Sequence, residues 1–285
     1  MIENIDLMDN RIYTNVINQN VGYIKSVMKA KNIDKKYETL VILGSGLGNV
    51  ADSVKVDFEI EYSSMPYMPS SLVAGHKSKF VFGELQGKKV VIMVGRIHYY
   101  EGYSMRAVTL PVRIMKKLGV NNLIVTNASG AINKEFKIAS IVAITDHINY
   151  TSLNPLIGEN LEEFGERFPA MSDVYDKKTI DKVIKAASLK NISVNSGVYL
   201  YVTGPSYETR SEIKMFRNMG ADIVAMSTVP EVIVAKHSGM KVVGFSCVTD
   251  ICDSETAPSH EEVLKSSEKG SKDMLEVIKL ALEEM

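Results

Sequence analysis

Apolar runs and helical patterns alternate along this chain from about residue 39 to its end. Short apolar runs, several of them continuous and β-branched, predict strands at Thr39–Leu43, Val90–Val94, Asn122–Val125, Ile141–Ile144, Tyr199–Thr203 and Val242–Phe245. Such runs are typical of strands covered on both faces. Helical patterns cover 104–118, 178–189, 210–219, 230–238 and 260–283. The alternation predicts an α/β fold, a single domain with a mixed central β-sheet flanked by helices on both sides.

Local signals mark the ends of several predicted helices. The Ser/Thr-x-x-Glu capping box fits three pairs, which are Thr209 with Glu212, Thr228 with Glu231, and Ser259 with Glu262. Gly220 and Gly239 stand where helix C-caps are expected. Residues 151–178 are the least regular stretch and predict a long surface excursion, which in a compact domain is often functional or lies at an interface. We divide the chain into an N-terminal helical segment, 1–37, and one domain, 38–285.

Composition narrows the range of partners and compartments. Apolar residues make up 45% of the chain and charged residues 24%, an ordinary globular balance, and the net charge is −1 with both signs interleaved. We therefore expect no nucleic-acid partner and no membrane surface. The N-terminus has no basic segment followed by an apolar one, so we expect no signal peptide. No window reaches the roughly 18 apolar residues of a membrane span. Cys247 and Cys252 are expected to be free thiols in a cytoplasmic protein.

The first candidate for chemistry is the glycine-rich segment Gly44-Ser45-Gly46-Leu47-Gly48, directly after a predicted strand. Glycines let a backbone approach an anion closely, and the Ser45 hydroxyl can donate a hydrogen bond beside the main-chain N–H groups. The segment has neither the spacing and lysine of a P-loop nor the dinucleotide fingerprint. A phosphate-binding loop and an ordinary tight turn both fit.

A second segment, Gly95 to Gly102, carries a stronger signal. On an extended backbone Arg96, His98 and Tyr100 lie at alternate positions, so all three point to one face. A guanidinium, an imidazole and a phenol that converge at a strand end suit an anion attached to a hydroxylated sugar, because arginine matches phosphate oxygens in bidentate fashion. The alternative is a solvated strand end with an aromatic tail.

Two further segments are candidates for ligand binding. Thr126-Asn127-Ala128-Ser129-Gly130 comes directly after a predicted strand, and ligands gather at the carboxyl ends of strands in parallel α/β sheets. Ala225-Met226-Ser227-Thr228 precedes a helix whose free N–H groups and dipole favour an anion. For Thr228 a plain helix cap is the preferred interpretation.

The histidines and cysteines show no spacing typical of a zinc site, and we predict no metal. His147 and His237 are interpreted as structural, His76 lies in a loop, and His260 opens the last helix. The chain has no Gly-x-Ser-x-Gly elbow, which argues against a serine hydrolase.

Taken together, the motifs resemble those of the trimeric purine nucleoside phosphorylases. The resemblance covers roughly residues 38–283 and rests on six segments in order: 44–48, Gly75-His76, 95–102, Thr126-Asn127-Ala128, Gly204-Pro205-Ser206-Tyr207-Glu208-Thr209, and Met226-Ser227-Thr228-Val229-Pro230-Glu231-Val232. It implies the phosphorylase/hydrolase-like fold and a homotrimer. It also implies the activity, in which inorganic phosphate cleaves the N-glycosidic bond of inosine, guanosine or their 2′-deoxy forms, giving the base and (deoxy)ribose 1-phosphate.

The same resemblance implies roles for individual residues. Phosphate would be bound by Ser45, His76, Arg96, His98, Ala128 and Ser227. The pentose would contact Tyr100, Met226 and His260, and the purine would contact Tyr199, Tyr207, Glu208, Val224 and Asp250. His98, Glu208 and Asp250 are the expected catalytic residues, and Phe168 resembles the aromatic residue that the family lends to a neighbouring subunit's site. No cofactor is implied, because phosphate itself is a substrate.

One residue departs from the family pattern. Where 6-oxopurine-specific members have Thr-Asn, this chain has Thr249-Asp250, and relatives that cleave 5′-methylthioadenosine have Asp there but lack the glutamate seen here as Glu208. A phosphorylase with adenosine or 5′-methylthioadenosine as main substrate is therefore the alternative. A non-catalytic nucleotide-binding protein is a second one, against which the joint presence of Arg96, His98, Glu208 and Ser227 argues.

Overall fold

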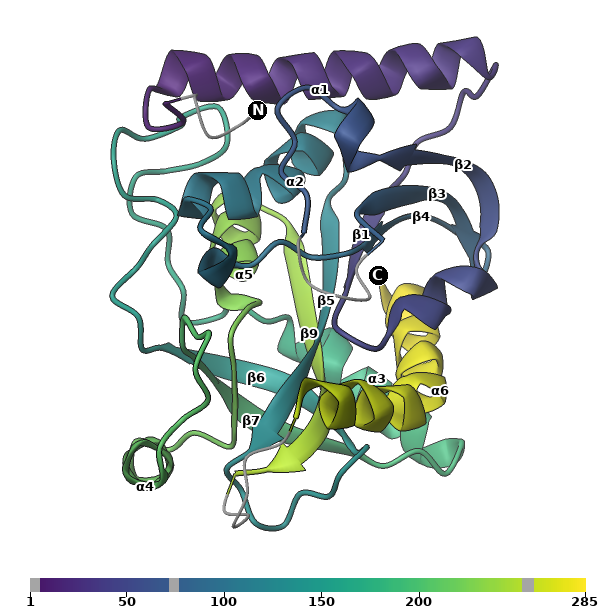
Figure 1. Cartoon of the computed structure of the whole chain (residues 1–285). Helices are drawn as coiled ribbons and strands as arrows, with labels where there is room; N and C mark the ends of the chain where they lie inside the picture. The colour runs from purple at the N-terminus through teal and green to yellow at the C-terminus, as the bar shows by residue number, and fades with distance from the viewer. Residues whose placement is uncertain (1–5, 72–76, 253–258) are drawn as a thin grey trace.

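The computed structural model describes residues 6–71, 77–252 and 259–285 (Figure 1). Within these residues nine strands form one sheet: β1 (Thr39–Leu43), β2 (Lys55–Glu61), β3 (Lys79–Leu85), β4 (Lys88–Val94), β5 (Asn122–Ala131), β6 (Ile141–Asn149), β7 (Val194–Tyr201), β8 (Ile223–Ala225) and β9 (Lys241–Ile251). The α-helices of the described chain are α1 (Asn10–Ala30), α2 (Met105–Leu118), α3 (Lys177–Leu189), α4 (Arg210–Asn218), α5 (Val229–His237) and α6 (His260–Glu284).

The sheet is mixed and partly closed on itself. Its order is β2-β3-β4-β1-β5-β8-β7-β6-β9, and a further pairing of β5 with β9 joins the last strand back to the middle of the sheet. The strands β4, β1, β5 and β9 are parallel neighbours, so their carboxyl ends lie along one edge. Ligands of open parallel sheets collect at such an edge.

Helices cover the sheet on both sides, which confirms the predicted fold class. Figure 1 shows α2 and α5 on one side of the central strands β5 and β9, and α6 on the other. α2 packs against α5, α3 packs against α6, and α1 packs on the outside of α2. Buried α1 side chains such as Tyr13 and Ile17 join the same apolar core as the strands, so the N-terminal helix is part of one packed unit. No helix in the described part of the chain is long and apolar enough to cross a membrane.

The sequence patterns locate the main elements well and miss three strands. β2, β3 and β8 were not predicted, and β7 ends at Tyr201, before Thr203. The capping boxes of Thr209 and Ser259 are confirmed, since each side chain accepts the N–H of the glutamate three residues on. Gly220 and Gly239 both follow helix ends with positive φ. The irregular excursion lies between β6 and α3, as predicted.

The third predicted capping box is wrong. Thr228 precedes α5 but makes no side-chain cap hydrogen bond, and its backbone has φ 73° and ψ −55°, outside the usual range of a cap residue. Glu231 instead forms an ion pair with Arg96, with Nε and Oε1 2.9 Å apart. The side chains of Thr228 and Glu231 thus make tertiary contacts and do not form a capping box.

Candidate active site

One pocket lies at the carboxyl ends of β1, β4, β5 and β9, beside the residues that follow β8 and the start of α6. It encloses about 700 Å³ including its open mouth, which suits a small molecule. It gathers most of the residues predicted for the site: Ser45, Arg96, His98, Tyr100, Ala128, Tyr207, Glu208, Val224, Met226, Ser227, Asp250 and His260. The strand ends that carry these motifs therefore meet at one pocket.

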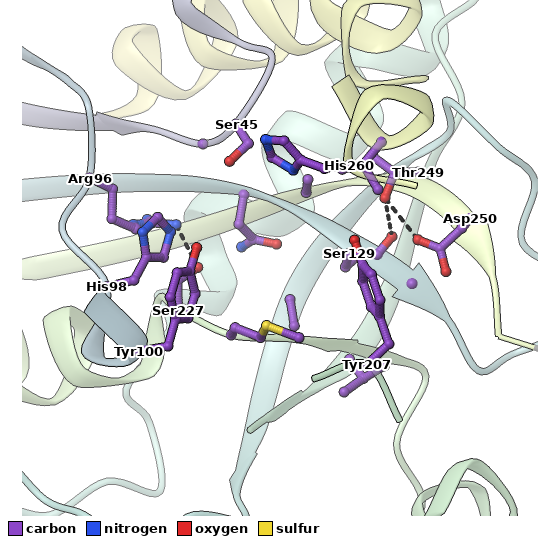
Figure 2. A pocket seen from close by; sticks show the side chains of 18 of the residues that line it. Ser45, Arg96, His98, Tyr100, Ser129, Tyr207, Ser227, Thr249, Asp250 and His260 are labelled. Carbon is purple, nitrogen blue, oxygen red and sulfur yellow. Dashed lines mark hydrogen bonds between the residues drawn. The ribbon is translucent and has the colours of Figure 1, made fainter. Parts of the chain in front are cut away.

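The pocket has two chemically different ends. Figure 2 shows Arg96, His98, Tyr100 and Ser227 together at one end. At the other end the figure shows Tyr207 and Asp250. We name these the basic end and the acidic end, after Arg96 and Asp250.

The basic end is organised around Arg96, whose side chain is 1% exposed. Its Nη1 donates to the Ser227 hydroxyl at 2.7 Å, and its Nε faces the Glu231 carboxylate. A buried guanidinium held on two sides keeps one orientation. A preorganised cation of this kind suits a doubly charged anion.

His98 and Tyr100 form the wall next to Arg96. The Glu101 carboxylate accepts the His98 backbone N–H at 2.7 Å and lies 3.0 Å from its ring Nδ1. The rings of His98 and Tyr100 stack with centroids 4.7 Å apart. Burial raises the pKa of Tyr100 to about 12, so its hydroxyl stays protonated at neutral pH.

The geometry of this wall differs from the one predicted. Arg96, His98 and Tyr100 do share one pocket, but Tyr99–Glu101 form a 3₁₀ turn rather than an extended strand end. The turn brings Glu101 back beneath His98, an interaction that the alternating pattern could not show. The only sequence signal for this interaction is the position of Glu101 three residues after His98.

The glycine-rich segment after β1 belongs to the pocket, where Gly44 and Ser45 line the wall. A Cβ at Gly44 would lie 2.5 Å from the Asn127 Cα, so only glycine allows these two backbones to meet. Behind this contact lies a buried polar network. Asn127 donates from Nδ2 to the Thr228 hydroxyl at 3.0 Å and accepts the Ser246 hydroxyl at 2.6 Å.

The acidic end contains two carboxyl groups, Glu208 and Asp250. Burial raises the pKa of Glu208, and the nearby Asp250 charge raises it further. Burial also raises the pKa of Asp250, partly opposed by the Thr249 hydroxyl, which donates to Oδ1 at 3.0 Å. Both carboxyl groups therefore favour the protonated form more than an exposed carboxyl group does.

Three predicted site residues lie elsewhere or outside the described chain. Tyr199 is fully buried, and its hydroxyl donates to the Ser227 carbonyl at 2.9 Å. It does not line the pocket, so its predicted contact with the purine is wrong. Phe168 lies on the excursion with 84% of its surface exposed and stays a prediction for a neighbouring subunit's site. His76 lies outside the described residues.

The remaining histidines match their structural interpretation. His147 lies 3.1 Å from the Tyr175 hydroxyl, and His237 is buried beside Arg113. Burial and the Arg113 charge lower the pKa of His237 to about 4, so its ring is neutral. Within the described residues no group of three or more His, Cys, Asp or Glu side chains is arranged to hold a metal ion.

Comparison with known proteins agrees with the fold and the pocket. Residues 38–283 match the model of the phosphorylase superfamily, so the fold and site define a member of that superfamily. The chain is 48% identical over 251 residues to purine nucleoside phosphorylase 1 of Bacillus subtilis (strain 168), covering 87% of this chain and 93% of that protein. This chain belongs to the purine nucleoside phosphorylases of the superfamily, and is a pentosyltransferase.

Solved structures give the same result. A Schistosoma mansoni purine nucleoside phosphorylase in complex with adenosine superposes with a TM-score of 0.88 at 39% identity, covering 94% of this chain and 96% of that one. A schistosoma purine nucleoside phosphorylase in complex with hypoxanthine superposes with a TM-score of 0.87 at 39% identity and the same coverage of both chains.

Proposed function

We propose that this enzyme cleaves inosine, guanosine and their 2′-deoxy forms with inorganic phosphate, releasing the purine and (deoxy)ribose 1-phosphate. The observation that carries the proposal is a single pocket with a buried arginine at one end and two carboxyl groups of raised pKa at the other. An anion and a purine can therefore be held at opposite ends, with the pentose between them. Relatives named purine nucleoside phosphorylase, among them a solved structure in complex with hypoxanthine, support this activity over the adenosine or 5′-methylthioadenosine alternative.

At the basic end, Arg96, His98 and Ser227 would bind phosphate together with Ser45 and the backbone of Ala128. Cleavage of the glycosidic bond builds positive charge on the pentose, as in an oxocarbenium ion. A phosphate dianion fixed beneath C1′ stabilises that charge and then bonds to it. Orienting the two reactants in advance can lower the barrier by about 7–11 kcal/mol. No nucleophilic side chain is needed, and we propose that no metal or cofactor takes part.

At the acidic end, the departing purine collects negative charge that must be stabilised. An ionised Glu208 accepts a hydrogen bond from N1–H, which hypoxanthine and guanine carry and adenine lacks. A protonated Asp250 donates to O6 or N7 of the same base, which offsets the new charge. Burial raises the pKa of Asp250, which favours its protonated form. Tyr207 and Val224 would pack on the base, and Tyr100, Met226 and His260 would contact the pentose.

We also propose that the enzyme is a cytoplasmic homotrimer. Phe168 supports this assembly, because a large aromatic side chain that is 84% exposed on an ordered excursion is suited to burial against another subunit. In a ring of identical subunits, a residue that enters a neighbour's pocket makes a heterologous contact.

The test of the reaction is its dependence on phosphate. We expect hypoxanthine release from inosine to require inorganic phosphate and to yield one ribose 1-phosphate for each base. An undiminished rate in phosphate-free buffer, with free ribose as product, would show a hydrolase instead. Running guanosine and adenosine in the same assay ranks the bases.

A further inference from the structure

The backbone at Thr228 adopts a rare conformation directly beside the basic end. With φ 73° and ψ −55°, and with the Val229 N–H donating to the Ser227 carbonyl at 2.8 Å, the residue sits at the centre of a three-residue γ-turn of the strained hand. A β-branched residue at positive φ is a genuine outlier, and glycine would adopt the same angles with less strain. The chain therefore keeps threonine here against its backbone preference, which indicates that the side chain is needed.

The Thr228 side chain is completely buried and joins the polar network under the pocket. Its hydroxyl accepts a hydrogen bond from Asn127 Nδ2 at 3.0 Å. The other side of that amide, Oδ1, accepts the Ser246 hydroxyl at 2.6 Å, so the orientation of Asn127 is set from both sides. Since Asn127 stands on β5, the network ties the γ-turn to the most central strand of the sheet.

The turn determines where the Ser227 hydroxyl points. Tyr199 holds the Ser227 backbone from behind, because its hydroxyl donates to the Ser227 carbonyl at 2.9 Å and lies 3.3 Å from the Ser227 N–H. With the backbone held in this way, the Ser227 hydroxyl lies 2.7 Å from Arg96 Nη1 and 3.3 Å from the Thr228 hydroxyl. A relaxed turn would move Ser227 away from Arg96 and release the guanidinium on that side.

We propose that Thr228 is a positioning residue for anion binding: its strained γ-turn, anchored by Asn127, aims Ser227 and through it Arg96 at the phosphate. The proposal rests on the proposed function, because it takes the basic end as the phosphate site. Thr228 itself does not line the pocket and acts only through its neighbours.

Three substitutions separate positioning from plain folding. Thr228→Gly fits the turn without strain and removes the hydroxyl, and Thr228→Val keeps the branched shape and removes the hydroxyl. Thr228→Ser keeps the hydroxyl. As a matched control, Ala139→Gly relieves a positive φ of 68° at a residue that does not line the pocket. For each full-length variant we would measure phosphate affinity by calorimetry, KM for phosphate and for inosine, and the melting temperature without phosphate.

We expect Thr228→Gly and Thr228→Val each to bind phosphate about tenfold more weakly, the usual effect of losing one well-placed hydrogen bond. KM for inosine should change less than about twofold, Thr228→Ser should retain most of the affinity, and Ala139→Gly should match the wild type. Wild-type phosphate affinity in the glycine or valine variant would overturn the proposal, whatever its melting temperature. Equal losses for phosphate and inosine would do the same. If the wild-type protein itself bound no phosphate, the proposed function would fail instead, so the two failures are distinguishable.

Discussion

The basic and acidic ends of the pocket are built in contrasting ways. At the basic end Arg96, His98 and Ser227 are all less than a tenth exposed, and each is held by a neighbouring side chain. At the acidic end Glu208 and Asp250 are only partly buried, and burial raises the pKa of both carboxyl groups. One end is fixed in geometry, and the other contains carboxyl groups that can be protonated or ionised.

This difference matches the demands of the proposed reaction. Phosphate is the same in every turnover, so a rigid, preorganised site serves it best. The purine varies, and a carboxyl group can donate a hydrogen bond when it is protonated and accept one when it is ionised. We infer that the basic end determines the reaction type and that the acidic end determines the choice of base. Each prediction below tests one side of this division.

The largest effect is expected at the basic end. Arg96→Ala should lower kcat/KM for phosphate by about 10²–10³-fold with every purine nucleoside, the range seen when one preorganised donor is lost. KM for phosphate should carry most of the change. Steady-state kinetics with phosphate and inosine varied separately would measure it, and an unchanged phosphate KM would remove Arg96 from the site.

Removing Arg96 also leaves the buried Glu231 carboxylate without its ion-pair partner, which can destabilise the fold by about 3–5 kcal/mol. Arg96→Lys controls for this, since it keeps a positive charge beside Glu231 but lacks the bidentate fork. We expect a melting temperature near that of the wild type and an intermediate phosphate affinity for the lysine variant.

The amino-acid sequence predicts the parallel strands and the position of the pocket, for physical reasons. Strands such as β1 and β4 are buried on both faces, and unbroken apolar runs show this directly. β2 escapes the pattern because it is the edge strand and alternates charged with apolar residues, and β8 is only three residues long. The strand ends carry the polar motifs, so their meeting at one edge follows from the parallel pairing.

The sequence does not show which nearby side chains contact the site. Tyr199 was expected at the base, but alternation along a strand only separates the two faces and does not identify the one that meets the pocket. Thr228 and Glu231 match a capping box letter for letter, yet the site uses both for tertiary contacts. Local rules fail most where a functional site overrides them.

A second, smaller effect is expected at the acidic end. Asp250→Asn replaces an adjustable carboxyl group with an amide that always has a donor for O6 or N7. The ratio of kcat/KM for inosine to that for adenosine should rise about tenfold, because a mispaired polar group discriminates between bases. An unchanged ratio would show that Asp250 does not contact the base.

The pH dependence of the same ratio provides a control. Since burial raises the pKa of Asp250, the group is protonated below that raised value and ionised above it. The protonated form donates to 6-oxopurines and the ionised form repels O6, so the wild-type ratio should fall as pH rises through the raised pKa. The asparagine variant should lose that part of the pH dependence, while Glu208 still titrates in both proteins.

The smallest effect is expected for Phe168. This residue tests whether one chain forms the whole basic end while a neighbouring subunit is needed to cover the rest of the pocket. The basic end is closed by residues of the same chain, whereas Phe168, from the excursion, is proposed to cover a neighbouring subunit's pocket. Phe168→Ala should therefore raise KM for inosine by about fivefold, in line with the loss of one aromatic contact, and leave KM for phosphate unchanged. Light scattering should show a trimer for the wild type. A rise in phosphate KM alone would contradict this arrangement, because Phe168 is proposed to cover the nucleoside and not the phosphate. A fully active wild-type monomer would also contradict it, because an aromatic side chain cannot complete a neighbour's nucleoside site without a neighbour.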